Sequence, residues 1–200
     1  MAWREKNANT VSMRTEKESK GRRPDAELTD RILTTCLAHL AAGGLEGLSL
    51  ARLAADIGTS KQALYRRFSS KEELARASLD AALTTFLPPT PERSNPARDL
   101  SRLLQAYRQN VFLNDPGRAL LKIRHLPAFE PIALGLEQEL QFHIRQILIA
   151  TPFEADMAVR IELFIAFLWH QAQVSENDIS GLSSAQKLDH AILTVLGLTA

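Results

Sequence analysis

The residues best suited to chemistry lie between Leu48 and Leu74, and the chemistry they suit is contact with a nucleic acid. Two short segments with the apolar spacing of helices flank Gly58. The second segment is too short to form a core element of its own, yet it is rich in amide, hydroxyl and cationic groups. Its polar side chains are Lys61, Gln62, Tyr65, Arg66 and Arg67. This pattern predicts a helix-turn-helix whose second helix faces a nucleic acid.

Local capping signals set the expected limits of these two helices. Ser49 is the expected N-cap of a helix that continues to Ile57, and Gly58 supplies a backbone able to turn. Thr59 stands three residues before Gln62 and forms a capping-box pattern with it. We therefore expect the second helix of the motif to begin at Thr59.

One face of this second helix should pack inward. Leu64 and Phe68 are four residues apart and share a face, which should bind the helix to the preceding ones. The residues expected to point away from the core are Gln62, Ala63 and Arg66, and those expected on its flanks are Tyr65 and Arg67.

The motif needs helices before and after it. Asp25 can cap a helix that runs to Ala42, and the pair Ser70 and Glu73 can open another that reaches Phe86. Cys36 and His39 have the spacing of half a metal site, but no second Cys or His pair completes it. We therefore expect Cys36 to pack in the core. We expect no metal or other cofactor. A single cysteine also forms no intrachain disulfide.

Charge is distributed unevenly along the 200-residue chain, although the net charge is only +1. The segment from Met1 to Lys71 has 13 Lys or Arg against 8 Asp or Glu, whereas the remainder has 11 against 15. A basic first third suggests that this end meets a polyanion. Residues 1–24 are expected to form a flexible basic arm. Arg22 and Arg23 in this arm either touch phosphates or enter the minor groove, or they belong to a solvated tail without contact to DNA.

The rest of the chain also has helical patterns and no alternating strand pattern. Four prolines between Pro88 and Pro96 form a connection. The expected helices after it span about 96–114, 118–126, 131–150 and 151–174, with a last one from Ser183, and Asp115-Pro116-Gly117 is expected to be a turn. Thr151-Pro152-Phe153-Glu154 is the strongest predicted helix start. The prediction is an all-α protein of about nine helices, divided into residues 1–24, 25–70 and 71–200.

The last two helices are expected to form a homodimer interface. Between Ile161 and Trp169 the chain is apolar nearly all round, and the apolar face of the final helix has no later chain to cover it. A second copy would cover both helices, with a buried monomer core as the competing explanation. The residues expected at this interface are Phe164, Phe167, Leu168, Leu188, Ile192 and Val195.

The segment from Leu28 to Ala82 resembles the DNA-binding domain of the TetR family of bacterial transcriptional regulators. The residues that carry this resemblance are Ile32, Leu33, Gly44, Ser49, Leu53, Ala54, Gly58, Thr59, Ser60, Lys61, Leu64, Tyr65, Phe68, Ser70, Lys71 and Leu74. The resemblance implies that Thr59, Tyr65 and Lys71 touch phosphates, and that Lys61, Gln62 and Ala63 lie nearest the base edges. Gln suits adenine and Lys suits guanine. Arg66 and Arg67 replace the aromatic or histidine residues frequent in the family, and Leu48 replaces a frequent threonine.

The resemblance also implies a repressor that binds a palindromic double-stranded operator and releases it when a small molecule binds the carboxyl-terminal domain. The aromatic content there favours an apolar or aromatic effector. The candidate lining residues are Tyr107, Phe112, His125, Phe129, Phe142, His143, Trp169 and His170, each of which could instead pack in the core.

Two other functions compete with this one. An architectural or cell-cycle protein on the same scaffold would answer to a protein partner instead of a small ligand. An enzyme is not expected, because the five histidines are scattered and no Gly-rich phosphate loop or His-Glu-x-x-His spacing occurs. The charged amino terminus has no signal-peptide core and the apolar run from Leu163 to Trp169 is too short for a membrane span, so we expect a cytoplasmic protein.

Overall fold

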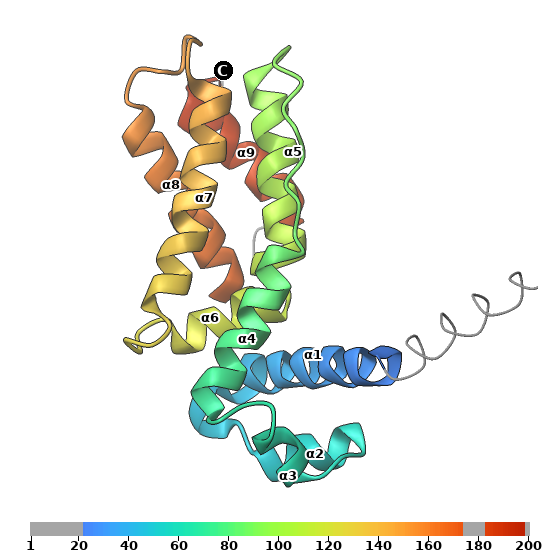
Figure 1. Cartoon of the computed structure of the whole chain (residues 1–200). Coiled ribbons are helices and arrows are strands. Elements are labelled where there is room, and N and C mark those ends of the chain that lie inside the picture. Colours follow the sequence, from blue (N-terminus) through green and yellow to red (C-terminus); the bar gives the residue numbers. More distant parts are fainter. Residues whose placement is uncertain (1–21, 174–182, 199–200) are drawn as a thin grey trace, which may run out of the picture.

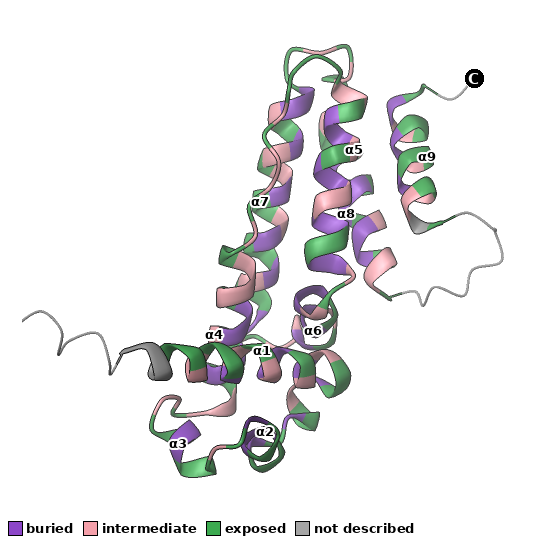
Figure 2. Ribbon diagram, turned by 90° about the vertical axis from the view of Figure 1, so that its right-hand side faces the viewer, coloured by how far each residue is buried: buried purple, intermediate pink, exposed green. Residues whose placement is uncertain are grey.

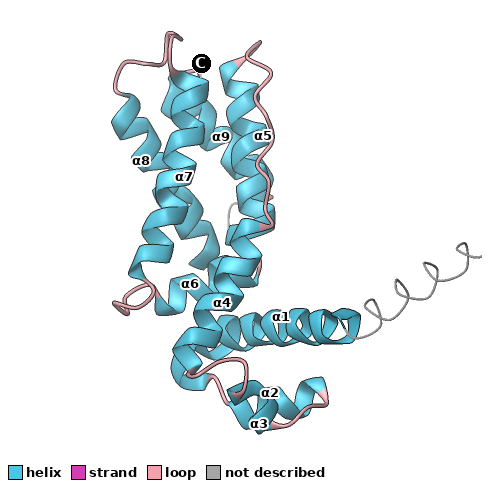
Figure 3. Ribbon diagram, viewed as in Figure 1, coloured by secondary structure: helices cyan, strands magenta, loops and turns pink. Residues whose placement is uncertain are grey.

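The structure is a computed structural model that describes residues 22–173 and 183–198. Every regular element in these residues is a helix, and none of them is a strand, which confirms the all-α prediction (Figure 3). The elements are α1 Arg22–Gly47, α2 Leu50–Ile57, α3 Lys61–Tyr65, α4 Lys71–Thr84, α5 Pro96–Tyr107, the π-helix η1 Arg108–Phe112, α6 Asp115–Ile123, α7 Glu130–Leu148, α8 Met157–Gln173 and α9 Ser184–Leu196. No described helix has an apolar stretch long enough to cross a membrane.

The helices form two groups that meet at α1 (Figure 1). The long helices α5, α7, α8 and α9 stand side by side, while α1 lies across the lower end of this bundle with α2 and α3 beneath it. Helices α4 and α6 both pack on α1 and so join the two groups. The helix-turn-helix therefore lies at the end of the molecule opposite the tip of the bundle.

A continuous core extends through both groups (Figure 2). Ile32, Cys36 and Leu40 on α1 have no exposed surface, as the apolar spacing predicted. Burial raises the pKa of the Cys36 thiol to about 11, so this thiol stays protonated and packs as an apolar group. In the bundle, Leu100, Leu104, Leu140 and Ile144 of α5 and α7 are buried in the same core.

The first helix differs from its prediction at both ends. It begins at Arg22, so the backbones of Arg22 and Arg23 belong to α1, and the arm prediction is wrong for residues 22–24. The remainder of the predicted arm lies outside the described residues. At the other end the helix bends at Gly44, whose φ of 65° few other residues adopt. A Cβ at Gly44 would come within 3.6 Å of the Lys122 Cβ on α6, so the bend lies directly against the bundle.

The connection between α5 and α6 is tighter than the sequence predicts. Helix α5 does not continue to Asn114, because a π-helical segment begins at Arg108, closed by a hydrogen bond from the Leu113 N–H to the Arg108 carbonyl at 2.9 Å. Asp115-Pro116-Gly117 is not a separate turn but the first turn of α6. The chain thus passes from α5 to α6 without an extended loop.

The predicted helix start at Thr151 is wrong. Its hydroxyl accepts from the Phe153 N–H at 3.2 Å and donates to the Leu148 carbonyl at 2.6 Å, so it closes a turn after α7. The Glu154 carboxylate bonds back to the Ala150 N–H at 2.9 Å. Asp156 then has a φ of 56°, a left-handed conformation that helical residues do not have. Helix α8 consequently begins at Met157.

Candidate nucleic-acid interface

Hydrogen bonds within a few residues hold the turn between α2 and α3. Ser49 caps α2, with its hydroxyl 3.4 Å from the Arg52 N–H. Gly58 ends α2 in the left-handed conformation, with φ 70°. The Thr59 N–H then donates to the Ala54 carbonyl at 2.8 Å, which assigns Thr59 to the end of α2 and not to the start of α3.

The N-cap of α3 is Ser60, which corrects the prediction of Thr59. The Ser60 hydroxyl accepts from the Ala63 N–H at 3.1 Å. Because the helix begins one residue later and has only five residues, both Ala63 and Leu64 face the core. Ala63 is 6% exposed, so its predicted outward orientation toward the base edges is wrong.

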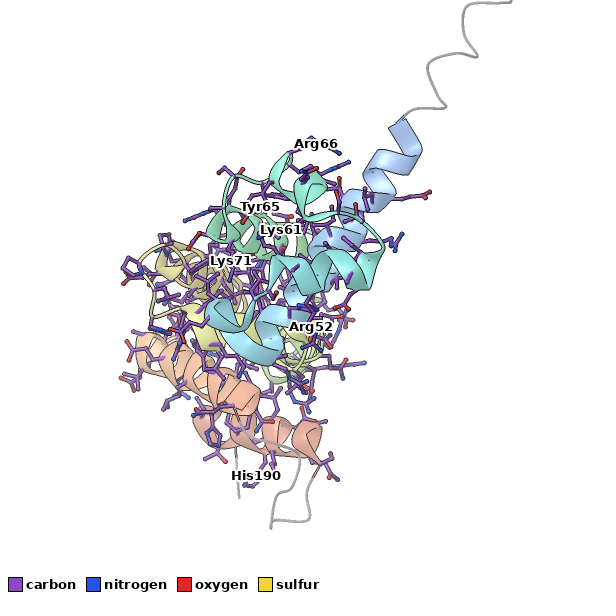
Figure 4. All side chains as sticks on the ribbon, turned by 90° about the horizontal axis from the view of Figure 1, so that it is seen from below. Arg52, Lys61, Tyr65, Arg66, Lys71 and His190 are labelled. Atoms are coloured by element: carbon purple, nitrogen blue, oxygen red, sulfur yellow. The ribbon has the colours of Figure 1, made fainter. Side chains whose placement is uncertain are left out.

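The outer face of α3 is cationic and aromatic. Lys61, Gln62 and Arg66 are exposed, and Tyr65 is 49% exposed. The Lys61 Nζ lies 5.5 Å from the centre of the Tyr65 ring, a cation–π contact that favours a defined position for both side chains. Figure 4 views this end of the molecule and shows Lys61, Tyr65, Arg66 and Lys71 around α3 and the start of α4. The exposed groups can thus meet a nucleic acid without rearrangement of the core.

Arg67 differs from its neighbours on α3. It is half-buried, and its guanidinium donates to the Ala63 carbonyl at 3.3 Å, within the same helical turn. The side chain therefore supports the end of α3. This placement does not favour the predicted contact between Arg67 and DNA.

Helix α4 begins beside this surface. The Ser70 hydroxyl accepts from the Glu73 N–H at 3.0 Å, but the Glu73 carboxylate accepts from the Ser69 N–H at 2.6 Å, one residue earlier than in the predicted capping box. Hydrogen bonds from the Ser69 hydroxyl and N–H lower the pKa of Glu73. Lys71 occupies the first position of α4 and is partly exposed on the same side as Tyr65. The cap thus holds Lys71 next to α3.

Arg52 was not among the predicted contacts. It is exposed on α2, three residues after Ser49, and Figure 4 shows it at the same end of the molecule as Lys61. Its position on the outward face of α2 follows from the inward stripe of Leu50, Leu53 and Ile57, which could have identified it from the sequence. Arg52 extends the cationic surface from α3 onto α2.

Two polar contacts fix α2 against α1. The Arg31 guanidinium donates to the Ile57 carbonyl at 2.7 Å, at the end of α2. The His39 Nε2 and the Asp56 carboxylate lie 2.8 Å apart. These contacts, with the core below them, hold the helix-turn-helix as one rigid unit on α1.

The residues predicted to line an effector pocket differ in burial. Tyr107, Phe112 and Phe129 are fully buried, and Trp169 is nearly so. His143 is half-buried on α7, four residues after Glu139. In contrast, Phe142 is 56% exposed and His125 and His170 are also at the surface, so the prediction that these three line an interior pocket is wrong.

The predicted dimer residues need a similar correction. Phe164, Leu168, Leu188 and Ile192 are buried within this chain, where α8 and α9 pack on the rest of the bundle. Phe167 and Val195 are half-buried. The exposed apolar residues of these helices are instead Ala158, Val159, Leu163, Ala166 and Leu193. The competing explanation, a monomer core, accounts for most of the predicted set.

The sequence of the helix-turn-helix segment matches known regulatory proteins. Residues 32–78 match the family described as bacterial regulatory proteins, tetR family. The chain is 42% identical over 62 residues to the HTH-type transcriptional repressor DrrR1 of Streptomyces coeruleorubidus, a match that covers 31% of this chain. The chain spans only 23% of the length of that repressor.

Solved structures share the fold over most of the chain. A TetR-like transcriptional regulator from Rhodococcus sp. RHA1 has a TM-score of 0.65 and 19% identity, over 87% of this chain and 98% of that one. A tetR-family regulator from Streptomyces coelicolor also has a TM-score of 0.65, with 18% identity over 86% of this chain and 80% of that one. The chain is thus similar to bacterial regulatory proteins of the tetR family in the sequence of residues 32–78, and it shares the helical fold of solved TetR-like regulators over most of its length.

Proposed function

We propose that this protein is a sequence-specific transcriptional repressor that binds a palindromic DNA operator as a homodimer and releases it when a small molecule binds. The observation that carries the proposal is the outer face of α3. There Lys61, Gln62 and Tyr65 are exposed on a helix whose other side is buried. A short helix presented in this way fits the major groove of B-form DNA.

The side chains divide into two kinds of contact. Lys61 and Gln62 have groups that pair with guanine and adenine edges, so we propose that they read the sequence. Thr59, Ser60, Tyr65 and Lys71 surround them and suit phosphate contacts, as do Ser49 and Arg52 on α2 and Arg66 after α3. Phosphate contacts set the position of the protein and make binding sensitive to salt.

A titration onto the promoter region next to the gene of this protein, at several salt concentrations, tests the proposal. Saturable binding is expected, with an affinity that falls steeply as salt increases. The absence of saturable, salt-sensitive binding would refute the DNA-binding function.

A homodimer is proposed because two recognition helices must meet half-sites about 34–36 Å apart. Val159, Leu163, Ala166 and Phe167 recur at helical spacing on the outer side of α8, and this row is here called the α8 stripe. Leu193 is exposed on α9, which packs beside α8. A second copy would cover both helices.

Leu163→Glu is expected to convert the dimer to a monomer, because two carboxylates would enter an apolar contact about the symmetry axis. We expect dimer affinity to fall by at least about 100-fold, measured by analytical ultracentrifugation. Leu134→Glu is the matched control, since Leu134 on α7 is 48% exposed and Leu163 is 50% exposed. A dimer that survives Leu163→Glu unchanged would show that the α8 stripe is not the interface.

The proposed release by an effector needs a connection between the bundle and α1. Trp169 on α8 donates from its Nε1 to the Glu137 carboxylate on α7 at 2.8 Å. The Arg124 guanidinium, at the end of α6, lies over the Trp169 ring at 4.5 Å. Because α6 packs on α1, a shift of α7 or α8 would be carried to the helix-turn-helix.

A second connection runs through α4. Arg76 on α4 donates to the Ala128 carbonyl, which lies between α6 and α7. An architectural protein would have the same contacts between the bundle and α1. The repressor and the architectural protein differ in what controls them, which is a small molecule for the first and a protein partner for the second. Release of the promoter DNA by small molecules, in the absence of any other protein, would distinguish the repressor from this alternative.

A further inference from the structure

One contact between side chains spans the outer face of α3. Lys61 is the first residue of this helix and Tyr65 is the last, so their side chains lie one turn apart on the same face. The Lys61 Nζ is 5.5 Å from the centre of the Tyr65 ring, within the range of a cation–π contact. Both side chains are exposed. The pair therefore occupies the surface that we propose to enter the major groove.

Tyr65 has the more firmly placed side chain of the two. Its neighbour Leu64 is 1% exposed, and the Leu64 carbonyl accepts from the N–H groups of Arg67 and Phe68 at 3.0 and 2.9 Å. A tyrosine side chain rotates about only two bonds, whereas the ammonium group of lysine ends a flexible four-carbon chain. The ring can therefore restrain the ammonium group of Lys61.

The carboxylates nearby do not compete with the ring for this ammonium group. Lys61 forms no ion pair with any carboxylate in the part of the chain that the structure describes. The Asp56 carboxylate contacts His39 instead, and the Glu73 carboxylate accepts from the Ser69 N–H. The direction of the Lys61 side chain thus depends on Tyr65.

This direction matters for reading a sequence. Lysine is a flexible point charge, so on DNA the phosphate oxygens compete with the O6 and N7 acceptors of guanine for its ammonium group. A contact with phosphate carries no sequence information. A ring that keeps the ammonium group over the outer face of α3 favours the base edge over the phosphates.

We propose that Tyr65 determines sequence specificity through Lys61, because its ring directs the Lys61 ammonium group toward a base edge while its hydroxyl contacts a phosphate. The inference rests on the proposed DNA-binding function, in which Lys61 reads a base. It makes Tyr65 a positioning residue for Lys61 in addition to a phosphate contact. Loss of the ring and loss of the hydroxyl should therefore have different effects.

Two substitutions separate the ring from the hydroxyl. The full-length protein is titrated by fluorescence anisotropy onto the duplex that footprinting of its promoter region identifies and onto a scrambled duplex of the same composition. The ratio of the two affinities is here called the specificity ratio. Tyr65→Phe retains the ring, so both affinities should fall alike and the specificity ratio should change by less than about 1.5-fold. Tyr65→Leu removes the ring and should reduce the ratio by at least about threefold, since a cation–π contact is stronger where DNA excludes water.

The same pair of substitutions in a Lys61→Ala protein shows whether Tyr65 acts through Lys61. Without the ammonium group the ring has nothing to direct, so Tyr65→Phe and Tyr65→Leu should have specificity ratios within about 1.5-fold of each other. A ring effect that persists without Lys61 would show that the ring itself reads the DNA and would overturn the inference. Equal specificity ratios for the two variants in the presence of Lys61 would overturn it as well.

NMR spectra of the free protein supply a measurement that needs no DNA. The Lys61 Hε signals should be shifted upfield by the ring in the wild type and in Tyr65→Phe, and this shift should be absent in Tyr65→Leu. Tyr65→Met also lacks a ring and should reproduce both results of Tyr65→Leu, so the outcome does not depend on the folding of one variant. Unshifted Lys61 signals in the wild type would refute the contact. The proposed function fails separately, if the wild-type protein shows no saturable binding to its promoter region.

Discussion

Replacing Lys61 and Gln62 together with alanine is expected to abolish sequence-specific binding while leaving the fold intact. Both side chains are exposed, and the core contacts of α3 come from Ala63 and Leu64 instead. Each good contact with a base edge contributes about 1–3 kcal/mol of discrimination. We expect each single substitution to reduce operator affinity by about 10- to 100-fold and the double one to reduce it to the level of unrelated DNA. Fluorescence anisotropy with operator and scrambled duplexes measures both affinities.

Two further variants separate sequence reading from charge. Lys71→Ala should weaken binding to operator and scrambled DNA alike and lower the salt dependence by about one counterion. Arg98→Ala removes an exposed cation from α5, in the bundle, and should change neither affinity. If the Lys61 and Gln62 variants weakened operator and scrambled duplexes equally, these residues would be phosphate contacts and the assignment of base reading to α3 would be wrong.

Gly117→Ala is expected to destabilise the protein strongly. A Cβ at Gly117 would come within 2.6 Å of the Phe112 Cα and 2.7 Å of the Val111 carbonyl oxygen. These are backbone atoms of the π-helix η1, so no flexible side chain can move aside to make room. Overpacking of a well-filled site typically costs about 1–3 kcal/mol, and contact with backbone at this distance places Gly117→Ala at about 3 kcal/mol or more. Urea unfolding followed by circular dichroism measures the loss.

Gly135→Ala is the control for this substitution. Gly135 lies within α7, and a Cβ there would meet nothing within 4 Å. The better helix propensity of alanine should therefore stabilise the protein by up to about 1 kcal/mol. Equal unfolding midpoints for Gly117→Ala and the wild type would show that α6 and η1 have room to separate, and the tight connection described here would be wrong.

The two glycines show a limit of sequence reasoning. Asp115-Pro116-Gly117 has the composition of a turn, and the sequence predicts one there. The structure instead uses Pro116 in the first turn of α6 and uses Gly117 for the close approach to η1. One glycine is needed because another backbone leaves no room for a side chain, and another is needed because a turn requires its conformation. The sequence does not distinguish the two, because tertiary packing decides which backbone lies next to a glycine.

Local hydrogen bonds explain which helix limits were predictable. Ser49, Gly58 and Ser70 act at α2 and α4 as predicted, since a cap and its partner are only three or four residues apart. Thr151 has an equally strong signal, yet its hydroxyl closes a turn and Asp156 takes a left-handed conformation. The first residue of α8 depends on where α7 ends and how α8 packs on the bundle. The capping pattern at Thr151 holds no information about either.

The sequence by itself determined the helical content, the helix-turn-helix and the outward position of Gln62 and Arg66, because these follow from spacing within single helices. Only the tertiary structure decided whether each apolar face is covered by other helices of the same chain or left exposed. Leu163 and Phe164 are neighbours in an apolar run, but Phe164 is buried in the bundle and Leu163 is half-exposed. Ala63 turned inward for the same reason. Periodicity reveals that a face is apolar, whereas burial depends on the helices that pack against it, and those lie far away in the chain.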